Sequence, residues 1–178
     1  FCSDKIPWEE HGFYLTEGSR PGLHPYHDAG LYYLQEPSAM APAGLLAVEP
    51  GMKVLDLCAA PGGKSTQLAG LMEGKGILLC NEPVPGRAQV LSRNIERMGI
   101  PNALVTCALP EQLSPRFPEY FDKVLVDAPC SGEGMFRRHP EARLEWTSAS
   151  PQGCAERQLH ILEHACQMLR PGGRLVFS

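Results

Sequence analysis

The sequence predicts an α/β domain built around a mostly parallel β-sheet. Short apolar runs of four or five residues, the length of buried strands, alternate with longer segments whose apolar residues recur at helical spacing. Glycine and proline stand at several boundaries between these segments, where helices and strands give way to loops. The alternation is typical of βαβ units, in which each helix crosses over from one strand to the next parallel strand.

The expected elements follow one another from the middle of the chain onward. Helices are expected over residues 37–47, 64–72, 87–98 and 156–169. Buried strands are expected over residues 53–57, 77–80, 103–107, 123–126 and 174–178. The last helix is expected to bury the face that carries Leu159, Leu162, Cys166 and Leu169.

Two parts of the chain differ in pattern. Residues 1–36 are rich in glycine, proline and aromatic residues without a sustained period, which predicts an N-terminal extension of loops and short elements. Residues 37–178 carry the alternating pattern and form the expected core. Because the chain ends at the fifth strand, we expect this core to be truncated there.

Composition favours a cytoplasmic protein. No apolar run reaches the ~18 residues that a membrane span needs, and the first residues do not have the pattern of a secretory signal. The seven cysteines are odd in number and show no CxxC spacing. This pattern indicates a reducing compartment rather than a disulfide framework or a cysteine-rich zinc site.

A loop of small residues joins the first expected strand to its helix. It reads Asp-Leu-Cys-Ala-Ala-Pro-Gly-Gly-Lys over residues 56–64, and its glycines allow a ligand to approach the backbone closely. The helix N-terminus adds free N–H groups. Because Gly62 and Gly63 are adjacent, the loop is neither a P-loop nor a GxGxxG loop. Doubly wound folds bind nucleotides at this point, and a tight turn without a ligand is the alternative.

An acidic residue follows the second expected strand. Glu82 comes 20 residues after Gly62, and Arg87 follows five residues later. A carboxylate at this position can accept hydrogen bonds from both hydroxyls of a ribose. Taken alone, Glu82 could equally be a solvated loop acid, but together with the glycine loop it is the favoured ribose ligand.

The fourth expected strand leads into Asp127-Ala128-Pro129-Cys130. Its carboxyl end is expected to place Asp127 and Cys130 over the same crevice as the glycine loop. Carbon 5 of a pyrimidine accepts a methyl group only after a thiolate has added at carbon 6, and a cysteine here suits that chemistry. From the residues alone, Cys130 is the candidate nucleophile, and a small buried structural cysteine is the alternative.

Several segments together resemble the NOL1/NOP2/Sun family of RNA cytosine-5 methyltransferases. They are LDLCAAPGGKSTQLA, NEPVPGR and VDAPCSGEGMFRRHP. The segment GLYYLQEPSAMAP, residues 30–42, resembles the motif that precedes the catalytic domain in that family. The continuation SGEGMFR is most similar to the bacterial 16S ribosomal RNA branch.

The resemblance implies a Rossmann-like methyltransferase core with S-adenosylmethionine as the methyl donor. The implied substrate is RNA, expected to be 16S ribosomal RNA or the small ribosomal subunit. By motif position, the implied cofactor contacts from the glycine loop are Cys58, Ala59, Ala60, Pro61, Gly62, Gly63 and Lys64. Glu82 would hold the ribose with Arg87 near it, and Asp127 would reach the methionine end or the target base.

The chain departs from the family pattern in two places. The third motif often has an aspartate near the adenine, whereas residues 106–109 here are Thr-Cys-Ala-Leu. In the family, the cysteine of the Pro-Cys motif, Cys130 here, assists product release, and the nucleophile follows the strand that starts at Arg174. The resemblance therefore implies that the nucleophilic cysteine lies beyond Ser178, and that residues 1–178 alone are inactive.

Two alternatives to an RNA methyltransferase remain at this level. The chain could be a cofactor- or RNA-binding fragment without turnover, or a DNA cytosine methyltransferase with Cys130 as its nucleophile, which the Ser-Gly-Glu-Gly continuation disfavours.

Because the chain has a net charge of -4, its contact with RNA depends on local basic residues. Those nearest the expected crevice are Arg137, Arg138, His139 and Arg143, which could equally form a solvated face.

No metal site is expected from the sequence. His160 and His164 have the i, i+4 spacing of zinc ligands on a helix, but the sequence shows no HExxH pattern and no evident third ligand.

Overall fold

A computed structural model describes residues 1–130 and 150–178 of the chain. Its central sheet has five strands in the order β5-β4-β3-β6-β7, and each neighbouring pair is parallel. The strands are β3 (Lys53–Asp56), β4 (Ile77–Asn81), β5 (Ala103–Thr106), β6 (Phe121–Val126) and β7 (Leu169–Phe177). The predicted parallel α/β sheet is confirmed. From β3 the chain adds strands first on one side of the sheet (β4, β5) and then on the other side (β6, β7). The point between β3 and β6 where this order switches is the crevice in which doubly wound folds bind ligands.

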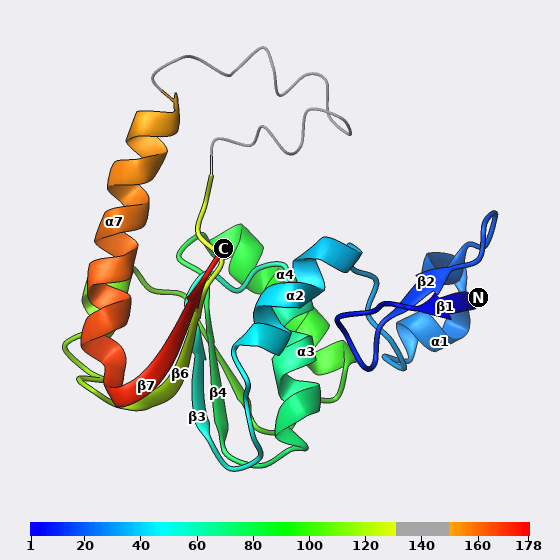
Figure 1. Ribbon diagram of the computed structural model, residues 1–178, viewed down its shortest axis with the longest axis horizontal. Coiled ribbons are helices and arrows are strands. Elements are labelled where there is room, and N and C mark those ends of the chain that lie inside the picture. Colours follow the sequence, from blue (N-terminus) through cyan, green and yellow to red (C-terminus); the bar gives the residue numbers. More distant parts are fainter. Residues whose placement is uncertain (131–149) are drawn as a thin grey trace.

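Helices cover both faces of this sheet (Figure 1). On one face lie α2 (Pro37–Leu45), α3 (Gly63–Met72) and α4 (Pro85–Arg97), and their apolar residues form one core with the sheet. On the other face, α5 (Pro110–Leu113) and α7 (Ser150–Met168) form a second core.

Alternation along the strands divides the buried residues between the two cores. Val54 belongs to the core under α3 and α4, whereas Leu55 belongs to the core under α7. The same alternation separates Val124 from Leu125 in β6, because successive side chains of a strand point to opposite faces. Each such side chain contributes about 1.5–3 kcal/mol of apolar burial, so the strands that hold the crevice are anchored from both sides.

The predicted buried face of the last helix is partly wrong, since Leu162 and Leu169 pack against the second core but Leu159 and Cys166 do not. Leu159 is 60% exposed, and Cys166 is also exposed. The buried residues of α7 are instead Ile161, Ala165 and Met168. Both sets satisfy the helical period, and only the position of the helix against β6 and β7 selects between them.

The predicted boundary between this helix and the last strand is also wrong. Leu169 already pairs with Phe121 and so begins β7, five residues before the predicted start. The Tyr120 amide donates to the Met168 carbonyl at 2.9 Å. Pairing between β7 and β6 therefore starts as soon as α7 ends. The register of this pairing shifts between the Phe121–Leu169 pair and the Lys123–Arg174 pair.

The N-terminal residues form a small unit beside α2 and α3 (Figure 1). It contains the antiparallel pair β1 (Cys2–Lys5) and β2 (Phe13–Leu15), the 3-10 helix η1 (Pro21–Leu23) and α1 (Pro25–Asp28). The Trp8 indole donates to the Pro37 carbonyl at 2.9 Å, and Gln67 of α3 donates to Glu9. This unit therefore packs on the core, while its boundary as a domain stays a prediction.

Two further expectations concern a cluster of basic residues and membrane-spanning segments. The basic residues Arg137, Arg138, His139 and Arg143 lie outside the described residues. Within residues 1–130 and 150–178, every helix is too short or too polar to cross a bilayer.

Candidate functional site

A cavity of about 230 Å³ opens at the carboxyl ends of β3 and β6. The glycine loop and the start of α3 form one wall, and the segment before α2 forms the opposite wall. The lining residues are Tyr33, Leu34, Gln35, Glu36, Ala39, Asp56, Cys58, Ala59, Ala60, Pro61, Gly63, Lys64 and Asp127. A larger cavity of about 390 Å³ lies between the N-terminal unit and α3 and shares Tyr33, Gln35 and Gly63 with it. Only the smaller one is lined by the residues at the strand ends.

Most of the residues that the sequence assigned to the cofactor line this cavity. Gly62, Glu82 and Arg87 lie outside its lining. The wall before α2 was not predicted to take part, although Gln35 belongs to the segment 30–42 that resembles a family motif. Its contribution depends on a contact between distant segments, which the sequence pattern does not encode.

Backbone hydrogen bonds hold the glycine loop across the strand ends. The Leu57 amide donates to the Leu125 carbonyl at 2.9 Å, and the Ala59 amide donates to the Asn81 carbonyl at 2.8 Å. The loop is therefore fixed to both neighbouring strands, β6 and β4, before α3 begins.

Both loop glycines are favoured over residues with a side chain, Gly62 by its backbone conformation and Gly63 by the close approach of Gln35. Gly62 has a φ of 115°, which a residue with a side chain rarely adopts. A Cβ on Gly63 would lie 2.5 Å from the Gln35 Oε1 atom. The bare backbone at this point therefore lets the wall before α2 close onto the loop.

Lys64 and Asp127 join the two halves of the site. The Lys64 ammonium lies 2.6 Å from the Asp127 Oδ2 atom, and only 15% of the lysine side chain is exposed. The other carboxylate oxygen of Asp127 accepts from the Ser178 hydroxyl at 2.9 Å. Asp127 is thus held between α3 and the carboxyl end of β7, with part of its side chain open to solvent.

The predicted ribose acid is buried beside an arginine. Glu82 is 1% exposed, and its Oε1 atom accepts from the Val84 amide at 3.1 Å. The Arg87 guanidinium lies 3.4 Å from Oε2 and also donates to the Ala60 carbonyl at 3.1 Å. Arg87 therefore bridges Glu82 to the glycine loop, and its own side chain stays largely exposed.

Asp56 is a site residue that the sequence analysis did not single out. It is fully buried, and burial is the main reason why the pKa of its carboxyl rises to about 7. Its Oδ2 atom accepts from the Ser65 hydroxyl at 2.6 Å, whereas Oδ1 has no partner among the described residues. An acid that ends an apolar strand directly before a glycine loop is the signal that could have identified it.

The two cysteines near the cavity differ in environment. Burial, followed by the nearby acids Asp56, Glu82 and Asp127, raises the pKa of the Cys58 thiol to about 12. Cys58 is therefore a protonated, unreactive thiol. Cys130 is exposed, and the preceding Pro129 carbonyl accepts from the Gln158 side chain of α7 at 3.0 Å. Of the two, Cys130 is the one accessible for chemistry.

Two family models match the chain. The first, 16S rRNA methyltransferase RsmB/F, matches residues 43–178. The second, the N-terminal domain of 16S rRNA methyltransferase RsmF, matches residues 1–37.

Curated relatives and solved structures give consistent similarities. Ribosomal RNA small subunit methyltransferase F of Escherichia coli is 41% identical over 97% of this chain, and the chain spans 37% of that relative's length. A methyltransferase homolog protein from Pyrococcus horikoshii has a TM-score of 0.85 and 34% identity, covering 98% of this chain and 54% of the other. NSun6 from Pyrococcus horikoshii, solved with SFG, has a TM-score of 0.80 and 29% identity, covering 88% of this chain and 40% of the other.

Proposed function

The chain belongs to the 16S rRNA methyltransferase RsmB/F family, and we propose that it forms the S-adenosylmethionine-binding core of an enzyme that methylates carbon 5 of a cytosine in small-subunit ribosomal RNA. The observation that carries the proposal is the cavity at the glycine loop, which brings Asp56, Lys64 and Asp127 together at the ends of β3 and β6. The reaction takes place in the cytosol, where bacterial ribosomal RNA is found.

The residues present fit S-adenosylmethionine. The partnerless Oδ1 atom of buried Asp56 is an acceptor for a cationic amino group. Glu82 supplies a carboxylate for ribose hydroxyls once the exposed Arg87 side chain turns away from it. The bound cofactor supplies an electrophilic methyl group, and the chain's residues bind it and orient the target base.

Lys64 and Cys130 have separate roles in this proposal. Lys64 fixes the orientation of Asp127 through their 2.6 Å contact, so that the exposed side of the carboxylate faces the target base. Cys130, three residues after Asp127 in the chain, is an accessible thiol and assists product release, as the family resemblance implies. The Ser178 contact places the carboxyl end of β7 at Asp127, so a cysteine that follows this strand would enter the same site as the nucleophile.

Cofactor binding is tested by isothermal titration calorimetry with S-adenosylmethionine. Glu82→Gln keeps the size of the side chain and its acceptor for the Val84 amide but removes the charge. We expect affinity to fall at least about tenfold, the effect of one lost charge-assisted hydrogen bond. Glu96→Gln, which changes an exposed acid on α4, is the matched control and should bind as the wild type does. Equal affinity of Glu82→Gln and wild type would remove the ribose assignment.

The role of Cys130 is tested with the Cys130→Ala variant of the enzyme that includes the cysteine after β7, together with small-subunit RNA and labelled S-adenosylmethionine. A cysteine that assists release is not needed to form the thiolate–carbon 6 bond, so its loss should trap RNA covalently on the protein. Denaturing gel electrophoresis would show this as a slower band. If Cys130 were the nucleophile, the variant would show neither adduct nor methyl transfer. Bisulfite mapping of the product identifies the methylated carbon.

A further inference from the structure

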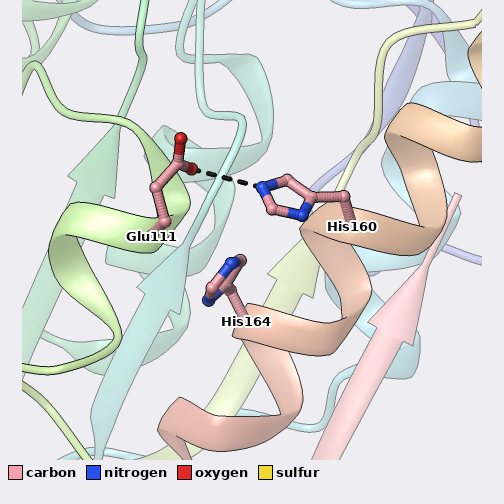
Figure 2. A group of neighbouring side chains, drawn as sticks. All are labelled: Glu111, His160 and His164. Carbon is pink, nitrogen blue, oxygen red and sulfur yellow. Dashed lines mark ion pairs between the residues drawn. The ribbon is translucent and has the colours of Figure 1, made fainter.

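Three metal-ligating side chains meet on the surface between α5 and α7, away from the glycine loop. Glu111 comes from α5, and His160 and His164 come from successive turns of α7; Figure 2 shows all three pointing toward a common space. One ligand atom from each lies within 4.8 Å of the other two. The Glu111 Oε2 and His160 Nε2 atoms are 3.5 Å apart, and the two imidazole centroids are 4.7 Å apart.

These distances approach those of a metal site. In a tetrahedral zinc site with bonds of about 2.0–2.1 Å, neighbouring ligand atoms lie about 3.4 Å apart. The Glu111–His160 pair already has this separation, and small side-chain rotations bring in the third atom. Two histidines and one carboxylate are a known three-ligand set for zinc, in which solvent completes the shell. The third ligand, which the sequence pattern did not show, is supplied by a segment 49 residues before His160.

The ligands are held in ligating form by their neighbours. The Nδ1 atom of His164 lies 2.8 Å from the hydroxyl of buried Ser114. When Nδ1 carries the proton, this contact leaves the Nε2 lone pair available, as second-sphere partners of metal-bound histidines do. The Glu111 carboxylate is held against His160, with its Oε2 atom 3.5 Å from the His160 Nε2 atom.

We propose that Glu111, His160 and His164 form a binding site for a divalent transition-metal ion of the zinc type, with water in the remaining position. Mg²⁺ and Ca²⁺ are disfavoured because they prefer oxygen ligands.

The bound ion cross-links α5 to α7. Besides His160, α7 carries Gln158, whose side chain holds the Pro129 carbonyl next to Cys130. Fixing the helix at His160 therefore also fixes the segment that leads to Cys130. The expected role of the ion is structural, since the site is separate from the cavity at the glycine loop.

The test is isothermal titration of the metal-free protein with Zn²⁺, in reducing buffer. The wild type should bind one Zn²⁺ at this site, and His160→Gln, His164→Gln and Glu111→Gln should each weaken that binding at least tenfold. His11→Gln removes an exposed histidine elsewhere and should bind as the wild type does. Unchanged affinity in the three variants would overturn the proposal, and the three side chains would then be held only by their contacts with one another and with Ser114.

A second measurement on the unaltered protein does not depend on whether the variants fold. Because the chain has seven free cysteines, zinc binding alone does not identify the ligands. Co²⁺ bound to histidine and carboxylate gives visible d–d bands without the near-ultraviolet charge-transfer band of thiolate ligation. The d–d bands alone would support the site, whereas a thiolate band, or no Co²⁺ binding, would overturn it. S-adenosylmethionine affinity should be unchanged in His160→Gln, which separates this proposal from the proposed function.

Discussion

Replacing Asp56 with asparagine is expected to remove a pH dependence of stability. Burial raises the pKa of the Asp56 carboxyl from 3.8 to about 7 in the folded protein. In the unfolded chain the carboxyl releases its proton near its ordinary value. Between these two values the unfolded state binds fewer protons than the folded state, so the free energy of unfolding falls as pH rises. The stabilising effect of the buried neutral carboxyl is complete below pH about 4 and lost as pH rises through about 7.

The size of this effect follows from the shift. The pKa shift is about three units, and each unit corresponds to about 1.4 kcal/mol. Burying the ionised Asp56 carboxylate therefore lowers the free energy of unfolding by about 4 kcal/mol above pH 7. Asparagine has the same shape, and its carbonyl can still accept from the Ser65 hydroxyl. Its NH2 group must take the position of Oδ1, which has no partner, at a cost of about 1–3 kcal/mol. We therefore expect Asp56→Asn to be about 1–3 kcal/mol more stable than the wild type at pH about 8.

The assay is urea denaturation followed by circular dichroism at pH about 4.5, 6 and 8. Asp4→Asn, an exposed acid in β1, controls for the loss of one negative charge. The advantage of Asp56→Asn over this control should grow by about 3 kcal/mol between the lowest and highest pH, since part of the effect is already present at pH about 4.5. An Asp56→Asn variant whose stability falls with pH as steeply as that of the wild type would refute the reasoning, because another group would then cause the dependence.

Two further predictions concern backbone fit and the ion pair at the site. Gly30→Ala should lower the free energy of unfolding by about 3 kcal/mol, because the φ of Gly30 is 75° and the new Cβ would lie 1.9 Å from the Arg97 carbonyl oxygen. Gly99→Ala is the control, since Gly99 has a φ of 63° but nothing within 4 Å of the new Cβ. It should lower the free energy of unfolding by only about 1 kcal/mol in the same urea titration. Lys64→Met should cost about 1 kcal/mol or less in stability, since Asp127 is 40% exposed and water replaces the lysine. In the enzyme that includes the cysteine after β7, the same change should abolish methyl transfer to RNA, and normal transfer would exclude a role for Lys64 in the reaction.

The elements of the sheet could be located from sequence because their signals are local. Apolar runs and helical periods predicted all five strands and the helices α2, α3, α4 and α7, with boundaries that differ by several residues at some ends. Where two periodic faces competed, as Leu159 and Ile161 did in α7, the pattern alone chose wrongly. The four-residue helix α5 was missed because it is too short to show a period.

The glycine loop, Glu82 and Asp127 could be proposed from sequence because each follows a strand in a parallel α/β fold, where carboxyl ends meet at one edge. Their individual roles stay predictions. The burial of Asp56, the contact between Lys64 and Asp127, and the wall before α2 appeared only in the structure.

The sequence by itself therefore determined the class of fold, the position of the glycine loop and the family, since these depend on residue types at short spacings. Tertiary structure decided which distant residues meet. Only in the structure does the segment before α2 face the glycine loop and does buried Asp56 line the same cavity. Likewise, only the fold brings Glu111 of α5 close to His160 and His164. Strand order and helix rotation set these contacts, and both depend on how two cores pack on one sheet rather than on any local pattern.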